Sequence, residues 1–284
     1  MGKTNIEWAD RVWNPIVGCT IVSPGCTNCY AMRMAARLNR MLPSSHYEGL
    51  TQSVNGRPVW TGKVALAPDH IFKAPLYWRK PTRVFVNSMS DLFHEDVPDE
   101  WVYDVFAVMI SQKRHQFQVL TKRPLRMKNF VSRIYDARSV DEAFPPPSNI
   151  WLGVSVEDQA RADERIPLLL ETPAAVRFIS AEPLLGPVDL SHIDISGDAM
   201  IEPLRTYSAA ELSEMWGENM DYGQNGLDWV IAGGESGPGK RPVDLAWLRS
   251  IRDQCRAAGV PVFIKQIDKI IPIPDDLMIR EFPQ

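Results

Sequence analysis

The stretch Ile150-Trp151-Leu152-Gly153-Val154 is a continuous apolar run, and it ends directly in the more polar segment Ser155-Val156-Glu157-Asp158. A run without polar alternation is typical of a parallel strand that is buried on both faces of a sheet. Five further stretches have the same form, and they lie at residues 83–87, 117–120, 176–179, 229–232 and 260–264. The sequence therefore predicts at least six parallel strands.

Helical patterns separate several of these strands. Pro98 suits the first position of one helix, Asp244 suits the N-cap of another, and Gly259 suits the end of that second helix. Strands that alternate with helices indicate an α/β fold, and the chain is long enough for a barrel. We therefore expect a full or partial TIM-like (β/α) barrel with parallel strands.

Length and composition favour one soluble domain. The chain has 284 residues, of which 45% are hydrophobic, so residues 1–284 are expected to share one core. The polar, less periodic stretch at about 191–226 is interpreted as an insertion between two strands.

The N-terminus does not resemble a signal peptide, and no apolar run approaches the ~18 residues of a membrane helix. These features predict a cytoplasmic protein with no membrane partner.

Net charge limits the class of partner. The formal net charge is −4, and broad non-specific binding to nucleic acid needs a basic surface instead. A local basic patch remains compatible with this charge. Arg33, Arg37 and Arg40 have helical spacing, which predicts either a solvated helix face or a face that meets nucleic acid.

Three of the four cysteines lie within eleven residues, with the spacing C-x6-C-x2-C. In a reducing compartment, Cys19, Cys26 and Cys29 point to metal binding or catalysis rather than to disulfides. Three thiolates can bind three irons of a [4Fe–4S] cluster and leave the fourth iron open to another ligand. We predict that these cysteines are metal ligands. Cys255 falls on the apolar stripe of a helix and is predicted to lie in the core.

Zinc and unligated thiols are the alternatives to a cluster. Zinc usually takes four protein ligands in a structural site, and the cysteine loop offers three. His94 or Asp91 could supply the fourth ligand in space. A site closed in this way would be structural.

Charged residues follow four of the predicted strands. Glu157, Glu182 and Glu235 each come after an apolar run, and Lys265 follows the last run. The carboxyl ends of parallel strands gather at one edge of the sheet, so these four side chains are predicted to be catalytic. A structural role for each glutamate is the alternative. Lys265, Lys122 or a bound cation would balance their charge.

The cysteine loop carries a resemblance to a known group of enzymes. The segment Asn14-Pro15-x-x-Gly18-Cys19 and the later segment Gly25-Cys26-x-x-Cys29-Tyr30-Ala31-x-Arg33 resemble the cluster motif of radical S-adenosylmethionine (SAM) proteins of the spore photoproduct lyase-like group. Residues 120–124, Leu-Thr-Lys-Arg-Pro, resemble a Thr-Lys-Ser-Pro segment of that group. The loop departs from the usual C-x3-C-x2-C spacing by three residues. Tyr30 also follows the third cysteine, whereas the group has an aromatic residue before it.

A closer resemblance covers nearly the whole chain. It is to a phage-associated three-cysteine-motif family of unknown function, whose members lie in phages, prophages and mobile elements. The matching segments lie at residues 6–8, 13–15, 86–94, 151–157, 181–187, 233–237 and 263–266.

These resemblances imply an activity and its cofactors. A radical-SAM-like barrel would hold a [4Fe–4S] cluster, bind SAM at the open iron, and cleave SAM reductively to act on an unknown substrate. Nucleic acid is the first substrate candidate, and a phage-encoded protein is a candidate partner. SAM would be held by acceptors for its ammonium and donors for its carboxylate, and the residues expected to supply them are Ser88, Ser90, Asp91, Lys122 and Arg123.

Two further functions compete with this one. The first is a non-enzymatic iron–sulfur or zinc module that docks a partner protein or nucleic acid, and a closed metal site would distinguish it. The second is a zinc-dependent hydrolase that uses the carboxylates at the strand ends.

Overall fold

The computed structural model describes residues 4, 6–136, 145–195, 200–206 and 226–284. The chain forms two compact units. Unit 1 contains residues 1–123 and 147–151, and unit 2 contains residues 124–146 and 152–284.

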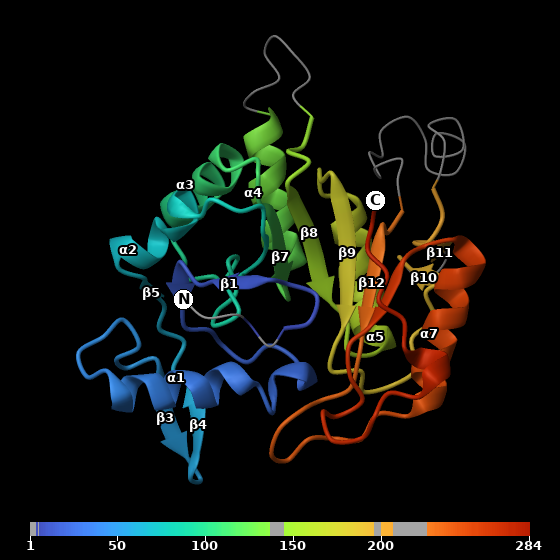
Figure 1. Cartoon of the computed structure of the whole chain (residues 1–284), viewed down its shortest axis with the longest axis horizontal. Coiled ribbons are helices and arrows are strands. Elements are labelled where there is room, and N and C mark those ends of the chain that lie inside the picture. The colour runs from blue at the N-terminus through green and yellow to red at the C-terminus, as the bar shows by residue number, and fades with distance from the viewer. Residues whose placement is uncertain (1–3, 5, 137–144, 196–199, 207–225) are drawn as a thin grey trace. The chain divides into compact units, whose positions relative to one another are not determined.

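The main sheet has seven strands in the order β1-β6-β7-β8-β9-β12-β13 (Figure 1). Their bounds are Arg11–Trp13 (β1), Arg83–Val86 (β6), Gln116–Thr121 (β7), Ile150–Ser155 (β8), Val176–Ala181 (β9), Trp229–Ala232 (β12) and Val262–Ile264 (β13). The pairs β1–β6, β6–β7, β9–β12 and β12–β13 are parallel. This confirms the α/β class with parallel strands, and the strand order is consistent with a partial β/α barrel.

All six predicted strands are present, with bounds close to the expected ones. Every residue of β8, β12 and β13 is buried, which is why their sequences lack alternation. The seventh strand, β1, was not predicted. Its three residues are too few to show a period, and only Trp13 is fully buried.

Unit 1 inserts a small subdomain between β1 and β6. Its elements are β2 (Ile16–Val17), a 3-10 turn (Pro24–Cys26), α1 (Tyr30–Met41), β3 (Thr51–Val54), β4 (Arg57–Trp60) and β5 (Ala65–Leu66). The β3–β4 hairpin packs along α1. The remaining elements of unit 1 are α2 (Asp69–Phe72), a second 3-10 turn (Ala74–Tyr77) and α3 (Asp99–Ser111).

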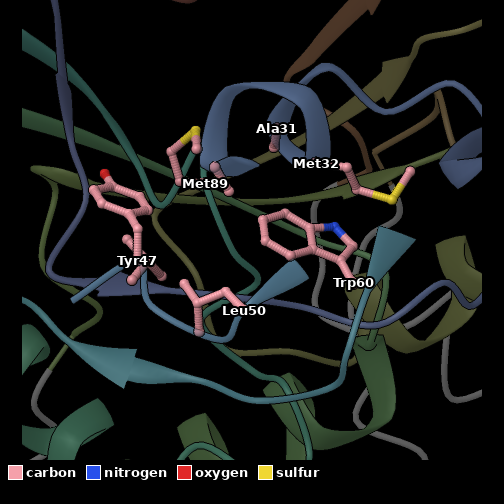
Figure 2. Packing of buried hydrophobic residues seen from close by; sticks show 8 residues of the cluster. Ala31, Met32, Tyr47, Leu50, Trp60 and Met89 are labelled. Atoms are coloured by element: carbon pink, nitrogen blue, oxygen red, sulfur yellow. The ribbon is translucent and has the colours of Figure 1, made fainter. Parts of the chain in front are cut away.

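A hydrophobic cluster lies beneath the cysteine loop. Figure 2 shows the Trp60 ring among Ala31, Met32 and Leu50, and the cluster also includes Val17, Ala35, Tyr47 and Met89. Cys19 and Cys29 pack against this cluster. The subdomain therefore gives the cysteine loop an apolar floor.

Unit 2 contains α4 (Pro124–Asp136), α5 (Gln159–Leu170), α7 (Leu245–Ala258), the short strands β10 (Ile193–Asp194) and β11 (Met200–Ile201), and a 3-10 turn (Asp275–Leu277). β10 and β11 pair antiparallel, so the described part of the expected insertion contains a small ribbon. Residues 196–199 and 207–225 of the stretch at about 191–226 lie outside the described residues. Among the helices described in the two units, none has the length and apolar character that spanning a membrane requires.

The ends of α7 match the sequence prediction. The Asp244 side chain accepts a hydrogen bond from the Ala246 N–H at 2.8 Å, and Gly259 ends the helix with φ 70°. We expect Asp244→Ala to lower the free energy of unfolding by about 1 kcal/mol, because an N-cap acceptor is lost. Denaturant titration measures this loss. Asp244→Asn keeps the acceptor and should retain the stability, so an equal loss in both variants would contradict the capping role.

Candidate functional site

The cysteine loop is fixed at both ends. Gly18 has φ +94°, its N–H donates to the Met89 carbonyl at 3.1 Å, and a Cβ there would lie 2.1 Å from the Lys63 carbonyl oxygen. Only glycine fits that backbone, so Cys19 starts from a set position. At the other end, Cys29 is the N-cap residue of α1.

All three thiols of the loop are free and partly exposed. In the described part of the chain, no three His, Cys, Asp or Glu side chains are grouped closely enough to hold one metal ion. Ligands of a single tetrahedral zinc must bring their sulfurs within about 3.8 Å of one another, given a Zn–S bond of about 2.3 Å. Cysteines that bind different irons of a cluster need not approach one another in this way. A set of three thiolates is the donor set of a cluster with one open iron, or of a zinc site that a fourth ligand completes.

The surroundings of the loop disfavour an isolated thiolate. Burial, followed by the nearby Asp91 carboxylate, raises the pKa of Cys19 to about 12, although Arg123 opposes this. Burial also raises the pKa of Cys29, against the backbone amides of Ala31 and Met32 at the start of α1. A nucleophilic cysteine needs a lowered pKa, so Cys19 and Cys29 do not have the environment of a nucleophilic cysteine.

Arg123 connects the cysteine loop to the ends of β6 and β7. Its Nη1 lies 3.1 Å from Asp91 Oδ2 and 3.8 Å from Cys19 Sγ, and its Nη2 donates to Thr20 Oγ1 at 2.6 Å. Its Nε donates to both carboxylate oxygens of Glu95 at 2.9 Å. Burial would lower the pKa of Arg123, but the charges of Asp91, Cys19 and Glu95 outweigh that effect and raise it. The guanidinium is thus a buried positive charge beside a predicted cluster ligand.

The Asp91 carboxylate is fully engaged by protein donors. Oδ1 accepts from Thr121 Oγ1 at 2.7 Å and from the Phe93 N–H at 3.0 Å. Oδ2 accepts from the Lys122 N–H at 2.9 Å as well as from Arg123. An ionised carboxylate has about four acceptor positions, and all are used here. In this structure Asp91 holds Arg123 in place.

Both nitrogens of His94 are also engaged. Nδ1 accepts from the Asp96 N–H at 3.1 Å, so Nε2 carries the proton and donates to Thr20 Oγ1 at 3.1 Å. Burial, and then the neighbouring Arg123, lower the pKa of His94. The structure therefore places neither His94 nor Asp91 as a free fourth ligand beside the cysteines.

Ser88 and Ser90 bind the chain before the cysteine loop. Ser88 Oγ donates to Asn14 Oδ1 at 3.2 Å, and Ser90 Oγ donates to the Ile16 carbonyl at 2.9 Å. Lys122 differs from these residues because it is partly exposed, and its charge opposes the rise that burial causes in the pKa of Cys29. Among the five residues predicted to bind SAM, Lys122 is the best placed to meet a ligand carboxylate.

In unit 2, Glu182 and Lys265 meet across a glycine. The strand register pairs Ala181, Ala232 and Ile264, so the next residues, Glu182, Gly233 and Lys265, form a row at the carboxyl ends of β9, β12 and β13. Lys265 Nζ lies 3.1 Å from Glu182 Oε1, and a Cβ on Gly233 would lie 2.8 Å from that oxygen. The glycine therefore leaves the space in which the ion pair forms.

The other two predicted catalytic carboxylates have arginine partners. Glu157 Oε2 lies 3.0 Å from Arg165 Nη1, and the two side chains are 0% and 2% exposed. Glu235 binds Arg241 through both oxygens, at 2.6 and 3.0 Å. Each carboxylate is therefore balanced by its own cation, as charge balance requires.

Four residues at these clusters were not predicted. Thr20 and Glu95 contact Arg123, while Arg165 and Arg241 pair with glutamates. Thr20 and Glu95 are adjacent in sequence to Cys19 and His94, which was the available signal. Arg165 lies on a helix, and nothing in the sequence around it indicated a pairing with Glu157.

Comparison of the chain with protein-family models matches residues 3–274 to a family described as "Protein of unknown function (DUF5131)". Comparisons with curated proteins and with solved structures give no match.

Proposed function

Since the chain belongs to the DUF5131 family, we propose a function from its own residues: an iron–sulfur enzyme of the radical-SAM type. Its [4Fe–4S] cluster binds Cys19, Cys26 and Cys29, and SAM occupies the open iron. As the resemblance over nearly the whole chain implies, the enzyme is of phage or mobile-element origin, and it works in a reducing cytoplasm. The substrate is unknown, with nucleic acid as the first candidate.

The cysteine loop is the observation that carries this proposal. Three free, partly exposed thiols lie in one loop, over an apolar floor and with a buried guanidinium 3.8 Å from Cys19 Sγ. Three thiolates add three negative charges, and Arg123 and Lys122 offset part of that charge. With His94 and Asp91 engaged elsewhere, three thiolates leave one iron of a cubane open.

When bound, such a cluster supplies the electron for reductive cleavage of SAM. The residues of the chain position the ligands. Arg123, held by Asp91 and Glu95, fixes the side of the loop that carries Cys19 and Thr20. Lys122 supplies the cation for the SAM carboxylate, and Ser88 and Ser90 hold the backbone that leads into the loop.

The test is anaerobic purification with measurement of iron, sulfide and zinc. We expect about four irons and four sulfides per chain, an EPR signal after dithionite reduction that changes when SAM is added, and formation of 5′-deoxyadenosine. Stoichiometric zinc without iron or sulfide would overturn the proposal. A cluster whose EPR signal does not change when SAM is added would also overturn it.

Matched cysteine variants identify the ligands. Serine at Cys19, Cys26 and Cys29 should abolish iron binding. Cys255 is 0% exposed on α7, so Cys255→Ala should leave the iron content unchanged. Iron retained in the triple variant would exclude these three ligands.

A further inference from the structure

The exposed face of α1 carries a stripe of arginines. Ala31, Met32 and Ala35 are the buried positions of the helix, and Arg33, Arg37 and Arg40 lie on the opposite side. From Arg33 to Arg40 the stripe runs about 10 Å along the axis, given the rise per residue of an α-helix. Arg37 and Arg40 are exposed, and Arg33 is partly exposed.

No acidic side chain neutralises this face from within the helix. α1 has no Asp or Glu, and residues 18–66 contain five Lys or Arg against a single Glu, in a chain of net charge −4. Arg37 and Arg40 make no ion pair with any residue that the structure describes. The positive charge of the subdomain is therefore concentrated here, against the sign of the whole chain.

The C-terminal helix α7 provides a contrast. Arg249, Arg252 and Arg256 have nearly the same spacing as the α1 arginines. Arg249 pairs with Asp276 at 2.9 Å, and Arg252 pairs with Asp276 at 2.8 Å and with Asp253 at 2.7 Å. Arg249 and Arg252 are thus neutralised by carboxylates, which Arg37 and Arg40 of α1 are not.

Exposed aromatic and apolar side chains accompany the α1 arginines. Tyr30 is 48% exposed, and its hydroxyl donates to the Ser88 carbonyl at 2.9 Å, so the ring is held in place with a surface open to solvent. Met34 and Met41 follow at positions i+4 and i+11 from Tyr30, and they are 38% and 61% exposed. A basic track beside a fixed aromatic ring is the arrangement that binds the phosphates of a single strand while stacking its bases.

We propose that this face, formed by Tyr30, Arg33, Met34, Arg37, Arg40 and Met41, binds single-stranded nucleic acid. Guanidinium groups bind the phosphates, and the Tyr30 ring stacks on a base. Because Cys29 directly precedes Tyr30, a strand on this face passes the cysteine loop. The binding itself depends on the charges and the ring alone, whereas its meaning as substrate binding rests on the function proposed above.

The test is fluorescence anisotropy with a labelled 20-nucleotide single strand of DNA or RNA and with the matching duplex. R33Q/R37Q/R40Q should weaken single-strand binding at least ten-fold. It should also lower the slope of log affinity against log salt by about 2, since each lost phosphate contact contributes about 0.7. Tyr30→Ala should weaken binding roughly five-fold or more. The control R249Q/R252Q/R256Q should bind as the wild type does, and circular dichroism checks that all variants are folded.

Three results would overturn the proposal: no binding by the wild type, equal losses in the α1 and α7 variants, or tighter binding of the duplex than of the single strand. Failure of the strand-binding proposal can be distinguished from failure of the enzyme proposal. The assay needs neither iron nor SAM, so serine variants of the three loop cysteines should still bind the strand. If the protein binds the strand without iron, the α1 face is supported as a binding site for single-stranded nucleic acid. The iron, sulfide and EPR measurements then decide on the enzyme proposal.

Discussion

Asp91→Ala should lower the free energy of unfolding by about 3–5 kcal/mol, the usual cost of removing one partner from a buried ion pair. The Asp91 and Arg123 side chains are 7% and 6% exposed. Without the carboxylate, the hydroxyl of Thr121 and the backbone N–H groups of Phe93 and Lys122 lose their acceptor as well. Each unsatisfied buried donor adds to the cost.

Denaturant titration measures the effect, with a matched variant beside it. Asp96→Ala removes the same charge from an exposed side chain five residues away, and it should change the stability by less than about 0.5 kcal/mol. In the double variant Asp91→Ala/Arg123→Met, the loss should be smaller than the sum of the two single losses, because the interaction between the two side chains is counted in each single loss but removed only once. A loss for Asp91→Ala as small as that for Asp96→Ala would show that this network does not hold the loop.

Glu157→Ala should destabilise unit 2 to a similar degree, by about 3–5 kcal/mol. Glu157 has no exposed surface, and its partner Arg165 also donates to the Ser155 carbonyl at 2.9 Å. Removal of the carboxylate leaves a guanidinium that is 2% exposed without its buried counter-charge. Its first effect should therefore be on folding, and the predicted catalytic role of Glu157 stays a prediction.

The control for this variant is Glu164→Ala on the same helix as Arg165. Glu164 is 59% exposed and lies 3.9 Å from Arg165, so its loss should cost little. Glu157→Ala/Arg165→Met should recover part of the stability lost in the single variant, because a buried pair can be replaced by apolar side chains of similar size. Similar stabilities for Glu157→Ala and Glu164→Ala would mean that the pair is not a structural element of the core.

Local signals predicted most of the regular structure. The strand 229–232 and its partners were found because a strand covered on both faces must be apolar at every position. The ends of α7 were found because Asp244 and Gly259 act through their own backbone. The β3–β4 hairpin was not found, since only Trp60 of its eight strand residues is buried and the pattern does not alternate.

The candidate site was predictable as a set of residues but not as a set of pairs. Cys19, Cys26 and Cys29 were visible from their spacing, and the carboxylates were visible from their places after apolar runs. Their partners were not visible: Arg123 is 32 residues from Asp91, and Lys265 is 83 residues from Glu182. Separations of this length along the chain give no indication in the sequence that the two residues are in contact.

By itself, the sequence determined the six predicted strands of the main sheet, the caps of α7 and the three-thiol loop, because each depends on residues that are neighbours along the chain. The tertiary structure alone decided that Arg123 lies beside Cys19, that Asp91 and His94 are engaged by protein donors, and that each strand-end glutamate has its own cation. The physical reason is the parallel register of the strands. Register sets which strand ends become neighbours, and a charge that is buried there requires a partner that only the folded chain brings near.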